Sequence, residues 1–292
     1  MILLEATNIC NLSCNMCPID LMEREKGYMK YELFTSIIDQ LLEMPEYTRK
    51  KRIVLHGTGE PLLSKDFLKN LHYPGLVRLA TDSVFGIRDV DVTCNGVLMT
   101  EEQAHSLLSA KALKWIRISF NSSRREIYPH IQRKGDYDSV VATLRMLRDI
   151  AFAYDVRINV QYLKTNINAD ETQQEFERAL GFEFDERIYW TVKDCVSYGG
   201  QIPTDRVEQT VVHELTDQKP RDCYSRGLIV MWDGTVVGCC IDYDNAQPYG
   251  HLGFQTVSEV VGSNYLKQLE REYNERNYSR LPMCKDCCGI NV

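Results

Sequence analysis

Cysteine is the residue type whose number and spacing most directly indicate chemistry in this sequence. The chain has 11 cysteines in 292 residues. Nine of them form three groups: Cys10, Cys14 and Cys17; Cys223, Cys239 and Cys240; and Cys284, Cys287 and Cys288. The other two, Cys94 and Cys195, stand alone. Because the sequence has no secretory signal, so many cysteines favour metal or redox chemistry over disulfide bonds.

The first cysteine group is suited to an iron–sulfur cluster. Three thiolates on one tight loop can bind three irons of a [4Fe–4S] cube and leave the fourth iron without a protein ligand. Thiolate-rich sites select iron–sulfur clusters or zinc, but a closed structural zinc site uses four ligands and this loop supplies three. The spacing therefore favours a cluster with one open iron, and a zinc site or a loop of free thiols is the alternative.

The elements that must position this loop follow from the hydrophobic pattern. Short apolar stretches predict six strands, at 2–7, 53–55, 90–93, 115–120, 156–163 and 187–192. Helical patterns lie between them, at 31–44, from about 100, at 137–151 and at 169–180. Strands that alternate with helices imply a parallel sheet. Since six units are too few for a closed eightfold barrel, we predict an α/β fold, an open (β/α)6 partial barrel, over residues 1–193.

The rest of the sequence predicts a linker and a second, smaller domain. Residues 194–222 contain glycines and prolines and predict a linker or lid. Residues 228–238 predict a β-hairpin with an Asp233-Gly234 turn. Apolar positions between 257 and 269 then predict one helix. We therefore expect a C-terminal domain at 223–292 that contains the second and third cysteine groups.

Composition and charge exclude several classes of function. The formal net charge of −7 argues against a protein that follows the phosphates of a nucleic acid. No run approaches 18 apolar residues, so we expect no membrane span. Since no secretory signal is present, we expect a cytoplasmic protein.

The N-terminal motifs resemble those of the radical S-adenosylmethionine (radical SAM) superfamily. The Cys10-x3-Cys14-x2-Cys17 loop after the first strand is similar to the superfamily's cluster motif, so these cysteines would hold the SAM-binding [4Fe–4S] cluster. Gly57-Thr58-Gly59-Glu60 after the second strand resembles the Gly-Gly-Glu motif, which receives the methionine amino group of SAM. These motifs lie at the C-terminal ends of the strands, where parallel sheets carry their chemistry.

Later segments extend this resemblance. Cys94-Asn95-Gly96 after the third strand is similar to the superfamily's Thr-Asn-Gly motif, with cysteine in place of threonine. The resemblance implies further contacts with SAM from Ser119 and Asn121, at the end of the fourth strand, and from Arg133.

The C-terminal cysteines resemble the single-cluster version of the SPASM domain, often called a twitch domain. The pattern is Cys223-x10-Gly234-x4-Cys239, followed by Cys284-x2-Cys287. The resemblance implies that these four cysteines hold an auxiliary [4Fe–4S] cluster with no open iron, and zinc is the alternative. The Gly-x4-Cys spacing favours Cys239 over Cys240 as the ligand. Because the sequence ends five residues after Cys287, we expect no second auxiliary cluster.

The resemblance implies a reaction that begins with SAM. One electron from the reduced cluster would cleave SAM to methionine and a 5′-deoxyadenosyl radical, which abstracts a hydrogen atom from the substrate. Some relatives then oxidise a secondary alcohol of an aminocyclitol through the auxiliary cluster, and others epimerise a carbon of an aminoglycoside or a peptide. We predict epimerisation of a carbohydrate or aminoglycoside carbon, with Cys240, or in second place Cys195, returning the hydrogen atom. Dehydrogenation and peptide epimerisation or maturation are the alternatives.

The expected partners are a small polar substrate, as in antibiotic biosynthesis, and an electron donor such as flavodoxin or ferredoxin. Because the first strand begins at Ile2 with no leader-binding module before it, the sequence favours a small substrate over a peptide. We expect a polar cavity near the end of the last barrel strand, lined by Tyr189, Trp190, Lys193, Asp194 and Tyr198. A non-catalytic electron-transfer protein with a relic SAM site is a further alternative, which SAM cleavage would exclude.

Overall fold

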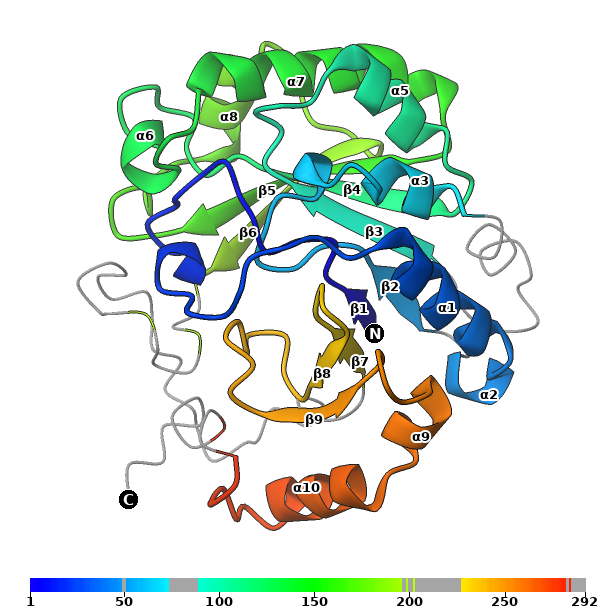
Figure 1. The fold of residues 1–292 in the computed structure, drawn as a ribbon. Coiled ribbons are helices and arrows are strands. Elements are labelled where there is room, and N and C mark those ends of the chain that lie inside the picture. Colours follow the sequence, from blue (N-terminus) through cyan, green and yellow to red (C-terminus); the bar gives the residue numbers. More distant parts are fainter. Residues whose placement is uncertain are drawn as a thin grey trace.

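The fold is built on one curved sheet (Figure 1). The computed structural model describes residues 1–48, 51–73, 89–195, 198, 202, 227–281 and 284. The barrel strands are β1 (Ile2–Leu4), β2 (Arg52–Val54), β3 (Asp89–Cys94), β4 (Leu113–Ser119), β5 (Arg157–Lys164) and β6 (Ile188–Asp194). Each of them pairs in parallel with the next, as the alternation of strands and helices predicts.

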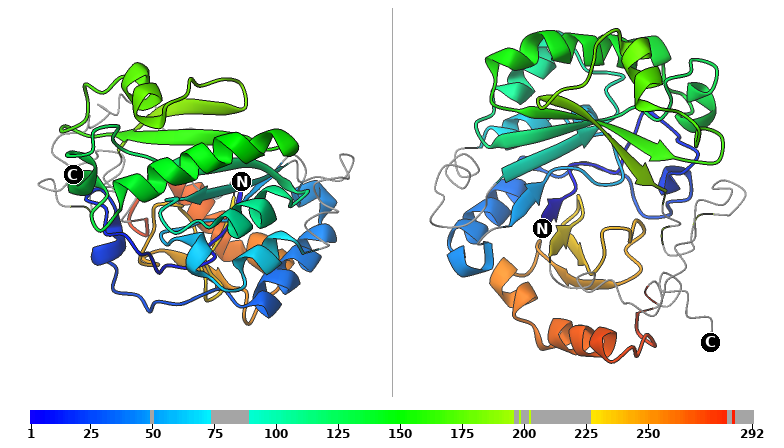
Figure 2. Two further views of the ribbon diagram at one scale, coloured as in Figure 1. Left: turned by 90° about the horizontal axis from the view of Figure 1, so that it is seen from above. Right: turned by 180° about the vertical axis from the view of Figure 1, so that it is seen from behind.

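Helices cover the outer face of this sheet (Figures 1 and 2). The longer ones are α1 (Tyr31–Leu42), α5 (Glu101–Leu108), α7 (Tyr137–Ile150) and α8 (Gln173–Leu180), and the shorter ones are α2 (Pro45–Thr48), α3 (Phe67–Leu71) and α6 (Tyr128–Ile131). Helix α8 begins at Gln173 rather than at the predicted 169, because Thr172 forms a capping box with Glu175. It ends at Gly181, whose φ of 78° lies in the left-handed region.

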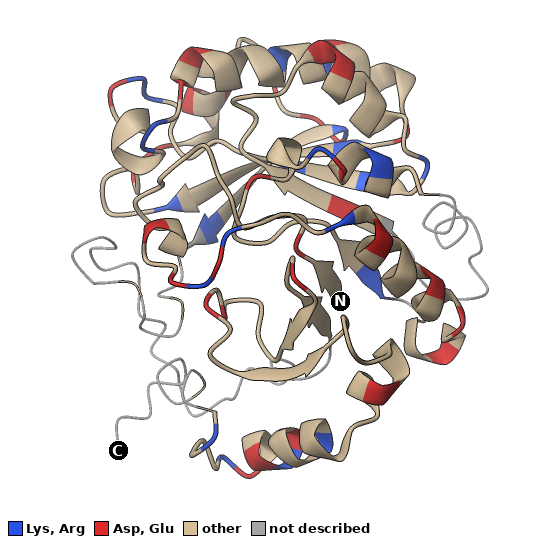
Figure 3. Ribbon diagram, in the orientation of Figure 1, with Lys and Arg blue, Asp and Glu red and all other residues tan. Residues whose placement is uncertain are grey.

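Alternation along β3 and β4 separates an apolar outer face from a polar inner one. Ile116 and Ile118 of β4 are fully buried in the main hydrophobic core beneath the helices. Arg117, between them, lines a cavity on the opposite face, as does Asp91 of β3. Figure 3 shows charged residues on the strands as well as on the outer helices. Each buried aliphatic side chain contributes about 1.5–3 kcal/mol, so the outer face holds the barrel together while the inner face carries polar groups.

The C-terminal segment extends the barrel sheet. Strand β7 (Leu228–Val230) pairs in parallel with β1, and β8 (Thr235–Val237) and β9 (Pro248–His251) continue from it as antiparallel strands. The strand order is β6-β5-β4-β3-β2-β1-β7-β8-β9, so β6 and β9 form the two edges and the barrel is open. The predicted fold class is confirmed, although the predicted two-stranded hairpin is part of a three-stranded meander.

The single helix predicted near the C-terminus is two helices, α9 (Val257–Val261) and α10 (Asn264–Asn274). The break lies at Gly262 and Ser263. The Ser263 hydroxyl accepts a hydrogen bond from the Leu266 N–H and caps α10. Local capping therefore outweighs the continuous apolar pattern on which the prediction was based.

Some predictions fall on parts of the chain that the structure does not describe. The linker or lid predicted at 194–222 lies almost entirely outside the described residues, as do Cys223, Cys287 and Cys288. The boundaries between the three predicted regions therefore stay predictions. In the described part of the chain, no helix is both long enough and apolar enough to cross a membrane.

Candidate active site

The cysteine loop follows β1 and is held in place by Arg133. Arg133 Nε donates a hydrogen bond to the Ser13 carbonyl at 2.7 Å, and the guanidinium forms an ion pair with Asp20 at 3.1 Å. The Ser13 N–H donates in return to the Arg133 carbonyl at 3.0 Å. The structure thus gives Arg133 a role in positioning the loop, and its predicted contact with SAM stays a prediction.

The thiols of this loop are partly buried and lie close enough to influence one another. Burial raises the pKa of Cys10, Cys14 and Cys17, to about 12 for Cys17, and the proximity of Cys10 raises the pKa of the other two further. Among the described residues, no three Cys, His, Asp or Glu side chains form a group that could hold one metal ion. Each cysteine of a [4Fe–4S] cube binds a different iron, so three thiols on one loop fit such a cluster.

Glu60 is a buried carboxylate that pairs with no cation among the described residues. The residue is only 2% exposed. Its Oε2 accepts the Asn95 N–H at 2.7 Å, and its Oε1 accepts the Leu62 N–H at 3.1 Å. Burial raises the pKa of Glu60 to about 7, although both hydrogen bonds act in the opposite direction. Because a buried charge is costly until it is paired, this carboxylate fits the methionine amino group of SAM.

The glycine-rich segment before Glu60 lies directly against the cysteine loop. The Gly59 N–H donates to the Thr7 carbonyl at 3.2 Å, and the Glu60 N–H donates to the Ile9 carbonyl at 2.9 Å. A Cβ atom at Gly59 would lie 2.5 Å from the Thr7 oxygen and 2.6 Å from the Ile9 oxygen. Only glycine permits this approach, so the two motifs are held as one unit.

Asn95 connects this unit to β3. Its Nδ2 donates to Asn11 Oδ1 at 2.9 Å and lies 3.9 Å from the Cys10 sulfur. Its backbone N–H binds Glu60. The ends of the first three strands therefore converge on one place, as the order of the motifs predicts.

Ser119 is the last residue of β4, Asn121 follows it, and both form hydrogen bonds with neighbouring segments. The Ser119 carbonyl accepts Gln132 Nε2 at 3.1 Å. Asn121 is 3% exposed, and its Oδ1 accepts the Leu163 N–H at 2.9 Å. These contacts connect the end of β4 to Gln132 and to β5, and the predicted contacts of Ser119 and Asn121 with SAM stay predictions.

Glu5 ties the glycine-rich segment to the C-terminal strands. The residue is fully buried, and both of its carboxylate oxygens accept hydrogen bonds from the Arg24 guanidinium, at 2.7 and 2.8 Å. It also accepts the Thr58 N–H and the Trp232 N–H, each at 3.2 Å. One buried ion pair therefore joins β1, the segment after β2 and the turn between β7 and β8.

Comparison with known proteins identifies the family to which the cysteine loop and the glycine-rich segment belong. Residues 4–179 match the radical SAM superfamily, and residues 223–288 match SPASM, an iron–sulfur cluster-binding domain. The chain belongs to the radical SAM superfamily. It is therefore an enzyme that binds SAM and a [4Fe–4S] cluster, with auxiliary iron–sulfur binding in its C-terminal domain.

Relatives of this radical SAM enzyme match different shares of it. The SAM-dependent 2-deoxy-scyllo-inosamine dehydrogenase of Niallia circulans is 22% identical over 100% of this chain and 94% of its own length. A tungsten-containing aldehyde ferredoxin oxidoreductase cofactor-modifying protein of Pyrococcus furiosus is 35% identical over 36% of this chain, which covers 26% of that relative. The crystal structure of BtrN in complex with AdoMet and 2-DOIA has a TM-score of 0.59 and 16% identity, over 98% of this chain and 91% of that one. This last likeness concerns the fold alone.

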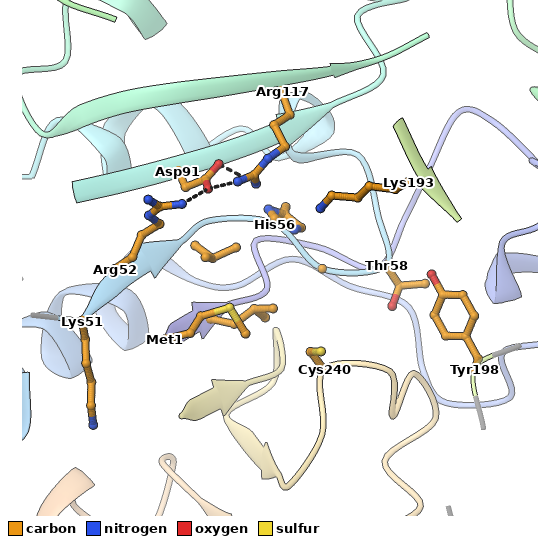
Figure 4. A pocket seen from close by; sticks show the side chains of 13 residues that line it. Met1, Lys51, Arg52, His56, Thr58, Asp91, Arg117, Lys193, Tyr198 and Cys240 are labelled. Atoms are coloured by element: carbon orange, nitrogen blue, oxygen red, sulfur yellow. Dashed lines mark hydrogen bonds and ion pairs between the residues drawn. The ribbon is translucent and has the colours of Figure 1, made fainter. Parts of the chain in front are cut away.

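A cavity of about 680 Å³ lies on the inner face of the sheet (Figure 4). Its volume is typical of small-molecule sites. Gly57 and Thr58 line it, together with Lys193 of β6, Tyr198 and, from the C-terminal domain, Cys240. Lys193 and Tyr198 were among the residues expected at a polar cavity. Another of that set, Trp190, instead stacks on a tyrosine ring of the core, with 5.8 Å between ring centroids.

The two cysteines predicted to return hydrogen lie in different surroundings. Cys240 is exposed and lines the cavity. Cys195 is only 7% exposed and packs with Met16 and Ile131 in a small apolar cluster, and it is not among the residues that line this cavity. Cys240 is therefore the better placed of the two to meet a substrate.

The auxiliary cysteines are described only in part. Cys239 is half-buried and Cys284 is buried, whereas Cys223 and Cys287 lie outside the described residues. The choice of Cys239 rather than Cys240 as a ligand stays a prediction. The exposure of Cys240 on the cavity wall is consistent with it.

Sequence reasoning missed a group of charged residues on the cavity wall. Asp91 is 1% exposed and accepts hydrogen bonds from Arg117 at 2.8 Å and from Arg52 at 3.3 Å. His56 also lines the cavity, and its Nδ1 is enclosed without a hydrogen-bond partner among the described residues. One signal was available: a charged residue lies between apolar residues in both β3 and β4. A parallel strand covered by helices on both faces is apolar throughout, so these charges indicate that one face of the sheet is not covered by helices.

Proposed function

We propose that this radical SAM enzyme epimerises one carbon of a small polar substrate of carbohydrate type, bound in the cavity on the inner face of the sheet. The observation that carries the proposal is that Cys240 lines the same cavity as Gly57 and Thr58. Cys240 comes from the C-terminal domain and the other two from the end of β2, so a substrate in this cavity would meet both (Figure 4).

The residues at the strand ends fit the cofactors. Cys10, Cys14 and Cys17 would hold the SAM-binding cluster, and Glu60 would accept the methionine amino group. Together these cofactors supply homolytic abstraction of hydrogen from an unactivated carbon–hydrogen bond. The protein contributes position: Gly59 keeps the segment close to the loop, and Asn95 fixes the Glu60 carboxylate.

Cys240 would return the hydrogen atom. Its S–H bond breaks and a new C–H bond forms on the face opposite to abstraction, which inverts the carbon and leaves a sulfur-centred radical. One electron and one proton, from a reductant such as flavodoxin or ferredoxin, restore the thiol. The substrate ends at its original oxidation state.

Dehydrogenation of a secondary alcohol is the second candidate function. It is favoured by the relative that matches the whole chain and is named as a dehydrogenase. In this case the substrate would lose a second electron to the auxiliary cluster and a proton to solvent, and Cys240 would have no part in the reaction.

The variant Cys240→Ala distinguishes the two functions. Reconstituted enzyme in D2O is given SAM, a reductant and a panel of free sugars, amino sugars and uronic acids. Epimerisation predicts one solvent deuterium at an inverted carbon in the wild type, and loss of that product with continued SAM cleavage in Cys240→Ala. The matched control Cys195→Ala keeps both. An oxidised product that survives in Cys240→Ala would favour dehydrogenation, and loss of iron in that variant would contradict the assignment of Cys239 as ligand.

A further inference from the structure

The inner wall of the cavity carries more positive than negative charge. Three cations, Arg52, Arg117 and Lys193, line it, and among the described lining residues Asp91 is the only carboxylate. Lys51 lines its edge, but its ammonium lies over a tyrosine ring and points away from the other charges (Figure 4). Since two of the three cations share one carboxylate, the wall keeps a positive excess.

Arg117 is prepared to bind a further group. Its ion pair with Asp91, which is almost wholly buried, fixes the guanidinium against the wall of the cavity. A guanidinium has five N–H donors, and the two hydrogen bonds to Asp91 leave others available. The side chain is 21% exposed on the cavity side of β4. A planar oxyanion is the ligand that such a fork of donors fits best.

Lys193 lies on the same wall and has no ion-pair partner among the described residues. Its ammonium forms no hydrogen bond or ion pair with the described residues, and Figure 4 shows it pointing toward His56. Partial removal of its ammonium from water and the nearby charge of Arg117 lower the pKa of Lys193, while Asp91 partly offsets them. An anion between Lys193 and Arg117 would relieve this repulsion.

His56 supplies a neutral polar atom beside these cations. Burial, reinforced by the charges of Arg117 and Lys193, lowers the pKa of His56 to about 3, so the ring is uncharged at neutral pH. Its enclosed Nδ1 has no partner among the described residues. His56 therefore adds no charge to the wall of the cavity at neutral pH.

We propose that the cavity selects a small substrate that carries an oxyanion, a carboxylate or a phosphate, and that Lys193 and Arg117 bind this group. The proposal rests on the proposed function, since it names the substrate class of the same cavity. Among carbohydrates, the expected substrates are therefore acidic sugars. Amino sugars are disfavoured, because an ammonium group would meet like charges on the wall.

The test is a binding measurement on the reconstituted holoenzyme with saturating SAM. Four probes of similar size are titrated by calorimetry: D-glucuronate, D-glucose 6-phosphate, D-glucose and D-glucosamine. At least one acidic sugar should bind about tenfold more tightly than glucose or better, which corresponds to about 1.4 kcal/mol, and glucosamine should bind most weakly. Added salt should weaken only the acidic probes. The ratio between uronate and phosphate identifies which oxyanion the site prefers.

Variants locate the effect on the cavity wall. Lys193 is exposed, so Lys193→Gln should leave the fold intact while weakening acidic sugars about tenfold and leaving glucose unchanged. Lys193→Arg should restore most of the affinity. The matched control is Lys111→Gln, which removes one charge from an exposed lysine outside the cavity and should change nothing.

Three results would overturn the proposal. The first is that neither acidic sugar binds, and the second is that glucose or glucosamine binds as tightly as the acidic sugars. The third is that acidic-sugar binding is lost as SAM is added, which would mean that the cations bind the carboxylate of SAM itself. None of these results contradicts the proposed function, which is tested separately by SAM cleavage and by Cys240→Ala. Conversely, a wild-type enzyme that binds acidic sugars but never cleaves SAM would contradict the proposed function alone.

Discussion

Glu5 and Glu60 are both buried carboxylates beside the same glycine-rich segment, but of the two only Glu5 pairs with a cation in the described part of the chain. Glu5 is paired through both oxygens with Arg24 and also accepts the Thr58 N–H. Glu60 accepts two backbone N–H groups and pairs with no cation among the described residues. The paired carboxylate of Glu5 holds elements together, whereas the carboxylate of Glu60 has only backbone N–H partners among the described residues, as a residue that binds a cationic ligand would.

The largest effect is expected when the paired carboxylate loses its partner. Arg24→Met leaves Glu5 as a buried, uncompensated charge, and we expect the free energy of unfolding to fall by about 3–5 kcal/mol. Denaturant unfolding of the wild type and the variant measures this loss. A decrease below about 1 kcal/mol would mean that Glu5 does not depend on Arg24, and the comparison would fail.

The pH dependence of stability tests the other carboxylate. In the SAM-free protein the pKa of Glu60 is raised to about 7 from its ordinary 4.5, so the folded state binds more protons than the unfolded one between these values. The stabilising contribution is therefore full below about pH 4.5 and is lost as the pH rises through 7, by up to about 3 kcal/mol. Glu60→Gln should lack this decline. Parallel pH profiles of melting temperature for both proteins would contradict the role given to Glu60.

Removal of the Glu60 charge should also weaken SAM binding. A hydrogen bond between charged groups contributes about 1.5–3 kcal/mol, so we expect Glu60→Gln to bind SAM roughly 10- to 100-fold more weakly, measured by calorimetry on the cluster-loaded protein. Its unfolding free energy at pH 7 should be unchanged or higher. A variant that is destabilised but binds SAM normally would show that Glu60 serves the fold, as Glu5 does.

Double variants that include Gly57 or Gly59 test which of the two carboxylates each glycine contacts. A Cβ at Gly57 would lie 2.4 Å from Glu5 Cγ, whereas a Cβ at Gly59 would meet backbone oxygens. Each alanine variant should lose about 1–3 kcal/mol of stability. Only Gly57→Ala should be non-additive with Arg24→Met, because both act on the same side chain. Additive losses in both double variants would exclude this coupling.

The smallest effect is expected at an exposed ion pair. Arg125 binds Asp138 through side chains that are 63% and 70% exposed. Because water and salt screen such a pair, Arg125→Met should leave the midpoint of denaturation unchanged within error. This variant is the matched control for Arg24→Met. A loss of stability as large as that of Arg24→Met would mean that burial does not explain the difference between the two ion pairs.

The motifs at the strand ends could be predicted from the sequence because they are local. Glu60 and Asn95 each follow a recognisable strand, and a parallel sheet brings such strand ends together whatever the details of packing. Their hydrogen bond is the direct result. The boundary at Gly181 was predictable for the same reason, since a left-handed residue ends a helix wherever it lies.

What the sequence did not reveal depends on contacts between distant segments. Arg24 lies 19 positions from Glu5, in a stretch without a periodic pattern, and nothing in its neighbours indicates burial. Asp91 and Arg117 are 26 positions apart on adjacent strands; alternation within each strand indicates their shared face, but their pairing depends on the register between the strands, which lies beyond the local pattern. The pairing of β7 with β1 is longer in range still.

That pairing has a consequence for the order in which the molecule is made. Strand β1 lies between β2 and β7, and the Trp232 N–H that completes the hydrogen bonds of Glu5 comes from a residue 227 positions later. At ordinary rates of translation this interval is on the order of tens of seconds. During that time one edge of β1 lacks its partner strand β7. The cysteine loop that follows β1 has then been made, but the sheet beside it is incomplete. Because β7 pairs with β1, the nine-stranded sheet is completed only after residues 228–251 have been made.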